Sequence, residues 1–221
     1  MKTLKRIPTS AVAIGVASWF VTSALADDIW PPDWRGQWST TSQYWEFRTP
    51  NPGPLQPDGS PFGGQPWLPS THLTVQPQGP WMPSDPFGSG REGIWPLSGR
   101  MNVMVDNHNP PNDYKFMWVQ LTWHNEPNKS PTGPHLSGFD PMYTLPGLTV
   151  FPRVNLGYGW YETTFMWQFD WNPPDESFVI GGNILLDELV IDTWCIPEPT
   201  TFSLLGGGLL LLTWRRRAVR G

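Results

Sequence analysis

The clearest pattern of hydrophobic and polar positions lies in the stretch GWYETTFMWQFDW, from Gly159 to Trp171. Every second position of this stretch is aromatic or β-branched: Tyr161, Thr163, Phe165, Trp167, Phe169 and Trp171. The positions between them are mixed and partly polar. Because successive side chains of a β-strand point to opposite faces, this alternation predicts a long strand with one aromatic face in the core.

Other stretches predict further strands. Alternating or β-branched residues mark 41–48, 72–76 and 101–106, and an irregular strand is expected around 148–157. Residues 114–124 (YKFMWVQLTWH) are apolar on both faces, which is typical of a central strand. The last stretch, NILLDELVIDTW, predicts one face with Leu185, Leu189, Ile191 and Thr193, interrupted by Asp187, and an opposite face with Ile184, Leu186, Val190 and Trp194 beside Glu188 and Asp192.

Proline and glycine dominate the segments between these strands. The chain has 27 prolines and 22 glycines, well above average usage. Residues 51–70 and 77–93 hold so many that a continuous ladder is excluded, because proline lacks the N–H donor. The 15 tryptophans argue against disorder. The expected fold is all-β: an antiparallel β-sandwich, jelly-roll-like, with long Pro/Gly-rich loops.

The N-terminus has the features of a secretory signal peptide. A basic start is followed by the apolar stretch AVAIGVASWFV, and small residues at Ala24 and Ala26 form a cleavage signature. Residues 1–26 are therefore predicted to be removed, so that the mature chain begins at Asp27.

Charge is unevenly distributed along the chain. Between Asp27 and Glu198 lie all 19 acidic residues but only seven of the 14 basic ones, a net charge of about −12 for this part. Such a surface repels phosphate backbones, which argues against nucleic acid as a partner.

No residues in the exported part form a recognisable catalytic or metal-binding motif. The four histidines lack the spacing of a zinc site, and no nucleophile elbow or phosphate loop is present. The one cysteine, Cys195, cannot form an internal disulfide, so the core alone must stabilise the domain. Glu162 and Asp170, eight residues apart on one strand face, would be about 27 Å apart, too far for a glycosidase pair. The sequence predicts no catalytic residue, cofactor or metal.

Aromatic residues are the remaining candidates for binding. Trp67, Trp81 and Trp95 lie in or near the Pro/Gly-rich loops, where exposed rings could form a platform for sugars. The alternative is that they fold back and cap the ends of the sandwich, since large exposed apolar patches are uncommon.

The C-terminus combines three features. An apolar run from Phe202 to Trp214 is followed by Arg215, Arg216, Arg217 and Arg220, which predicts a short transmembrane helix with a cytoplasmic stop-transfer tail. Pro197, Glu198 and Pro199 precede the run. In this order and at this terminal position, the three features resemble a PEP-CTERM sorting signal. The resemblance implies processing by an exosortase, a membrane-embedded enzyme of certain Gram-negative bacteria in which such systems accompany extracellular polysaccharide production.

The expected organisation is a signal peptide (1–26), a secreted β-sandwich (27–195) and a sorting signal (196–221). The protein is expected to be anchored in the inner membrane before processing, and to reach the cell surface or extracellular matrix afterwards. A non-enzymatic surface or matrix role is the first hypothesis. A carbohydrate-binding module for extracellular polysaccharide is the alternative, and a glycan-processing enzyme is a weaker one.

Overall fold

The computed structural model describes residues 28–60, 70–77, 79–106, 114–137, 148–169 and 175–196. Their regular elements are all strands: β1 (Thr40–Trp45), β2 (His72–Gln76), β3 (Trp95–Leu97), β4 (Arg100–Asp106), β5 (Tyr114–Asn125), β6 (His135–Ser137), β7 (Thr149–Val150), β8 (Val154–Gly157), β9 (Trp160–Phe169), β10 (Asp175–Gly181) and β11 (Ile184–Ile196). None of the described residues forms a helix long and apolar enough to span a membrane.

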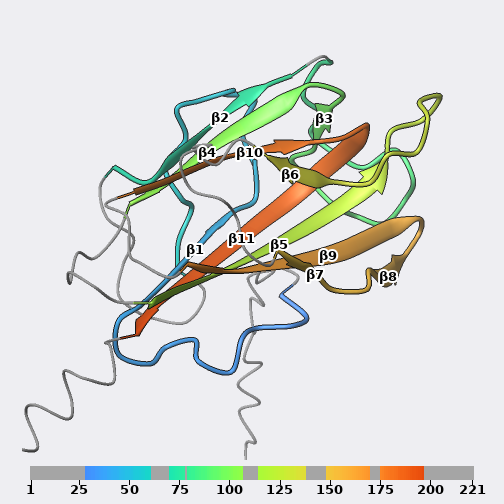
Figure 1. Ribbon diagram of the computed structural model, residues 1–221. Helices are drawn as coiled ribbons and strands as arrows, with labels where there is room; N and C mark the ends of the chain where they lie inside the picture. Colours follow the sequence, from blue (N-terminus) through green and yellow to red (C-terminus); the bar gives the residue numbers. More distant parts are fainter. Residues whose placement is uncertain are drawn as a thin grey trace, which may run out of the picture.

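The strands form two sheets that face each other (Figure 1). The large sheet has seven strands in the order β1-β11-β5-β9-β7, with β3 also paired to β11 and β8 also paired to β9. The small sheet has four strands in the order β2-β4-β10-β6. Every pairing of named strands is antiparallel. The all-β antiparallel architecture expected from the sequence is therefore confirmed.

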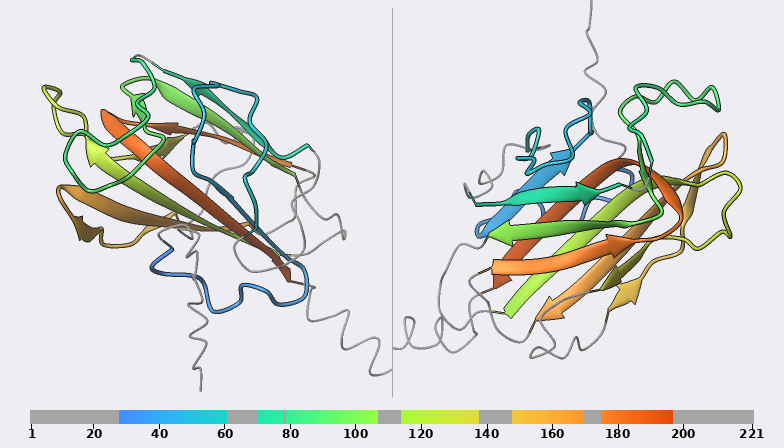
Figure 2. Two further views of the ribbon diagram at one scale, coloured as in Figure 1. Left: turned by 180° about the vertical axis from the view of Figure 1, so that it is seen from behind. Right: turned by 90° about the horizontal axis from the view of Figure 1, so that it is seen from above.

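The chain crosses repeatedly between the sheets, as the views in Figure 2 show. It passes from β4 in the small sheet to β5 in the large one, back to β6, and later from β9 through β10 to β11. Alternation of this kind is what a jelly-roll-like connection requires. The alternation supports the expected jelly-roll-like topology, which stays a prediction.

The core lies between the sheets. In the large sheet, Met117, Val119 and Leu121 of the central strand β5 are fully buried. Phe165, Trp167 and Phe169 of β9 join the same cluster, which confirms the aromatic face expected for this strand. Met101 and Val103 of β4 and Phe178 and Ile180 of β10 meet them from the small sheet. A buried ion pair, Lys115 with Glu176, connects β5 of one sheet to β10 of the other.

The face assignment for the last strand is wrong, because β11 contains a bulge. Its register with β5 shifts between Leu186 and Glu188. A bulge inserts an extra residue, so the alternation changes phase there. Ile184 and Leu186 consequently share the core with Leu189 and Ile191, whereas Leu185 packs on the other side of the sheet. The sequence placed Leu185 with Leu189 because it assumed an uninterrupted period of two.

The sequence also missed two short strands, β3 and β6. Each has three residues, and β3 contains Pro96, which made it read as part of a loop. β3 pairs with β11 and continues the edge that β1 forms further along the same strand. Trp95 is thereby held in the core.

Trp167→Ala is expected to unfold the domain or nearly so. The side chain is 1% exposed and packs on Phe165 and Phe178. Truncating a buried aromatic costs about 3–5 kcal/mol, a large part of a total stability of about 5–15 kcal/mol. Urea unfolding followed by circular dichroism measures the change. The control is Trp38→Ala, where the ring is 71% exposed; a similar loss in both variants would contradict the core assignment.

Candidate functional site

The face of the large sheet that points away from the core carries a group of polar side chains that are buried. We define this polar face by Ser42, Gln120, Thr122, Glu162, Thr164, Glu188 and Asp192, each of which is at most 5% exposed. The register places them on neighbouring strands, with Thr122 opposite both Glu162 and Glu188. Buried polar groups need hydrogen-bond partners or compensating charge. Other segments of the chain supply several of them.

One covering segment is residues 28–39, the N-terminal arm. Arg35 binds the Asp192 carboxylate with two donors, Nε to Oδ1 at 2.7 Å and Nη2 to Oδ2 at 2.5 Å. The same guanidinium pairs with Asp28, whose other oxygen accepts a hydrogen bond from Gln120 Nε2 at 2.5 Å. The N–H of Ile29 donates to Glu162 Oε2 at 3.3 Å. The arm therefore attaches to β11, β5 and β9 through charged and polar contacts.

Among these groups, Asp192 has the greatest need for a compensating partner, because none of it reaches solvent. Burial raises the pKa of its carboxyl above the ordinary value, while the hydrogen bonds and positive charge of Arg35 act in the opposite direction. The sequence analysis missed this pair. One signal in the sequence could have revealed it: Asp192 is a carboxylate within the stretch Val190–Trp194 of β11, where most of the other residues are apolar.

The second covering segment is residues 82–94, which pack over the other end of this sheet. Arg91 forms an ion pair with Asp187 and lies 5.2 Å from the ring centroid of Trp160. The Phe87 ring stacks on His124 with centroids 3.9 Å apart. Within this segment Asp85 accepts hydrogen bonds from the backbone of Phe87 and Ser89 at 2.8 and 2.6 Å. Burial opposes ionisation of Asp85, but its hydrogen bonds outweigh that effect and lower its pKa.

The polar face contains one pair of carboxylates that the sequence did not identify. Glu162 and Glu188 lie on the strands that flank β5, at positions opposite Thr122. Two strand spacings separate them by about 10 Å, near the separation at which glycosidases place their carboxyl groups. They are 1% and 5% exposed, and the arm contacts Glu162, so a sugar would reach them only if the arm moved. No group of three or more His, Cys, Asp or Glu in the described ranges is placed to hold a metal ion.

The tryptophans predicted to form a sugar platform do not lie together as exposed rings. Trp95 is 3% exposed and belongs to the core, which corrects its assignment to the platform. Trp81 packs partly buried against that core and donates a hydrogen bond from Nε1 to the Phe47 carbonyl at 2.8 Å. Both follow the alternative in which loop tryptophans fold back onto the sandwich. Trp67 lies outside the described residues.

The last strand ends where the predicted sorting signal begins. β11 stays paired to its final residue, with Ile196 opposite Tyr114 of β5 and Trp194 opposite Thr40 of β1. The N–H of Cys195 also donates to the Ser39 carbonyl at 3.1 Å. The predicted signal-peptide residues Ala24 and Ala26, the Pro197–Pro199 motif and the arginines at 215–217 and 220 lie outside the described residues.

The described part of the chain thus ends on a paired strand at Ile196, directly before the Pro197–Pro199 motif in the sequence. The family model of the PEP-CTERM protein-sorting motif matches residues 196–217. The chain therefore carries a PEP-CTERM sorting motif, which implies export, association with a membrane and processing by an exosortase. No curated protein and no solved structure matches the chain.

Arg35→Met is expected to destabilise the domain by about 3–5 kcal/mol, because it leaves the buried Asp192 charge without its partner. Adding Asp192→Leu should recover part of that loss.

Without Arg35, the Asp192 pKa rises further, so the folded state binds its proton more tightly than the unfolded state does. The stability difference between Arg35→Met and the wild type should therefore grow as pH rises through the raised pKa.

Urea unfolding of both variants between pH 4 and pH 8 measures this effect. A double variant no more stable than Arg35→Met, together with a difference from the wild type that does not depend on pH, would show that Arg35 acts by packing rather than by charge.

Proposed function

We propose that the protein is a non-enzymatic component of the cell surface or extracellular matrix, anchored in the inner membrane until an exosortase processes its tail. The observation that carries the proposal is the matched sorting motif, which begins at Ile196, the last residue of β11. The fold supports a structural role in one further respect. The face that bears a glycosidase-like pair of carboxylates is covered by the chain itself, through the N-terminal arm.

Pro197→Ala combined with Glu198→Ala is expected to leave export intact and to block trimming of the C-terminus. Prolines on both sides of Glu198 disfavour helix and sheet, and an extended segment would suit a peptide that a membrane-embedded protease binds. Mass spectrometry of the cell-associated protein reports both ends in one measurement. The new N-terminus should be Asp27 in the wild type and in the variant.

The chain offers a control in Glu126 and Pro127, which are the same two residue types in reversed order, in the loop after β5. Alanine at both of these positions should leave trimming unchanged. Trimming of the Pro197/Glu198 variant at the wild-type rate would overturn the proposed sorting, and an N-terminus at Met1 would overturn the predicted removal of the leader.

Carbohydrate binding is the second candidate function. Among the described residues, the exposed rings that could stack on a sugar are Trp30, Trp38, Tyr114 and Tyr158, which are 59%, 71%, 39% and 69% exposed. Trp67 remains a candidate from the predicted platform. If the domain is a binding module, Trp67→Ala should keep the wild-type melting temperature and lose retention on extracellular polysaccharide in a glycan array or pull-down. Unchanged retention would remove Trp67 from the binding surface.

Glycan processing is the weaker candidate, supported by the placement of Glu162 and Glu188 on either side of Thr122. It requires the N-terminal arm to leave the polar face. Release of reducing sugars by the wild type, abolished in both Glu162→Gln and Glu188→Gln, would favour it over the structural role.

A further inference from the structure

One end of the sandwich gathers aromatic side chains around the point where β11 leaves the fold. We call this the exit face and define it by Trp34, Trp38, Tyr114, Phe116 and Trp194. The Trp34 ring stacks on Trp194 with centroids 5.7 Å apart, and Phe116 lies 6.2 Å from the same ring. Tyr114 is opposite Ile196 in the sheet and is 39% exposed. Trp38 is 71% exposed and precedes Ser39, which accepts the Cys195 hydrogen bond.

The five residues of the exit face carry no charge, although the domain around it is strongly acidic and the exposed Asp33 directly precedes Trp34. The segments 34–38, 114–116 and 194–196 contain two charged side chains, Arg35 and Lys115. Arg35 is 4% exposed and paired with Asp192 and Asp28, and Lys115 is fully buried and paired with Glu176. Exposed apolar patches are uncommon on soluble domains, and where they occur they mark contact with a membrane or a partner.

The length of chain beyond β11 decides between these two kinds of occupant. Ile196 ends the strand, and the apolar run begins at Phe202. The five intervening residues span at most about 18 Å when fully extended. With the apolar run in the bilayer, the end of β11 is therefore held within about 18 Å of the bilayer core, close enough for the exit face to reach the headgroup region. Tryptophan and tyrosine are enriched at this level in membrane proteins, since their rings are apolar and their N–H or O–H reaches water.

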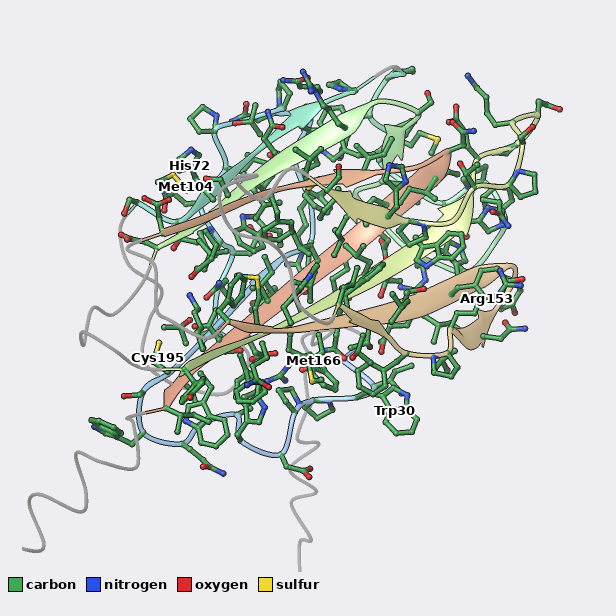
Figure 3. All side chains as sticks on the ribbon, in the orientation of Figure 1. Trp30, His72, Met104, Arg153, Met166 and Cys195 are labelled. Carbon is green, nitrogen blue, oxygen red and sulfur yellow. The ribbon has the colours of Figure 1, made fainter. Side chains whose placement is uncertain are left out.

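We infer that the exit face rests on the lipid headgroup region of the membrane while the sorting signal is still attached, with Trp38 and Tyr114 as the main contacts. The inference rests on the proposed membrane insertion of the tail. This contact adds a second attachment beside the tail itself. It holds the domain in one orientation, with the chain at Ile196 directed toward the membrane in which the processing enzyme is embedded. Figure 3 shows that Cys195 and the arm residue Trp30 both lie along the lower side of the domain.

The test is a depth measurement by spin label on the full, unprocessed chain in vesicles of phosphatidylcholine and phosphatidylethanolamine. Cys195→Ala removes the native thiol, and Gln37→Cys carries the label next to Trp38. Lys129→Cys is the matched control, because Lys129 is exposed in the loop after the opposite end of β5. Collision rates with oxygen and with a water-soluble nickel chelate give the depth of each label.

The label at position 37 should show an oxygen-to-nickel collision ratio several-fold higher than the label at position 129. Adding Trp38→Ser and Tyr114→Ser should lower the ratio at position 37 toward that at position 129, while circular dichroism stays unchanged. Equal ratios at the two positions in the otherwise unaltered chain would overturn the inference. So would dipolar coupling between labels at position 37, because it would show a second copy of the chain on this face.

A separate measurement distinguishes the inference from the proposed function. Extraction of the vesicles with alkaline carbonate reports whether the tail is inserted. Release of the protein would overturn the membrane insertion on which both rest. Retention of the protein with a water-exposed label at position 37 would overturn the docking of the exit face alone.

Discussion

The carboxylate of Asp192, buried within the longest strand, is the constraint on which the arrangement of the rest of the domain depends. An isolated charge at that depth would cost several kcal/mol. Arg35 compensates it with a bidentate contact, and this fixes the arm that carries Arg35. Because the arm continues directly into β1, it also brings Thr40 to its place opposite Trp194. One ion pair thus couples the N-terminal arm to the last strand.

The same coupling limits where the domain can bind anything. The polar face of the large sheet, the surface that a ligand-binding sandwich would leave open, is covered by residues 28–39 and 82–94. Its hydrogen-bonding groups serve internal contacts such as that between Gln120 and Asp28. With this face covered, the loops and the exposed rings are the described surfaces open to a partner. A covered polar face agrees with the proposed structural role, in which the sorting motif determines where the domain is located.

Strand alternation in the sequence was sufficient to predict the class of fold and the aromatic face of β9, since both follow from local patterns. The face assignment in β11 failed because a bulge at Asp187 is a property of pairing with β5, which no local period reveals. The same limit applied to Glu162 and Glu188, whose common neighbour Thr122 is set by register. Trp95 was a candidate for the platform because its environment of Pro and Gly concealed a three-residue strand. The sorting motif, by contrast, is a local signal and was readable in full.

The geometry of the first and last strands has a mechanical consequence. β1 and β11 are antiparallel, and the beginning of one lies beside the end of the other, at Thr40 and Trp194. A force that pulls Ile196 away from the sheet therefore breaks the hydrogen bonds of β11 one after another. The load is not shared among them. The first contacts to resist are the pairing of Ile196 with Tyr114 of β5, the Cys195–Ser39 hydrogen bond and the Trp34–Trp194 stack, followed by the Arg35–Asp192 pair. These contacts set how much tension the tethered domain withstands before its last strand peels away.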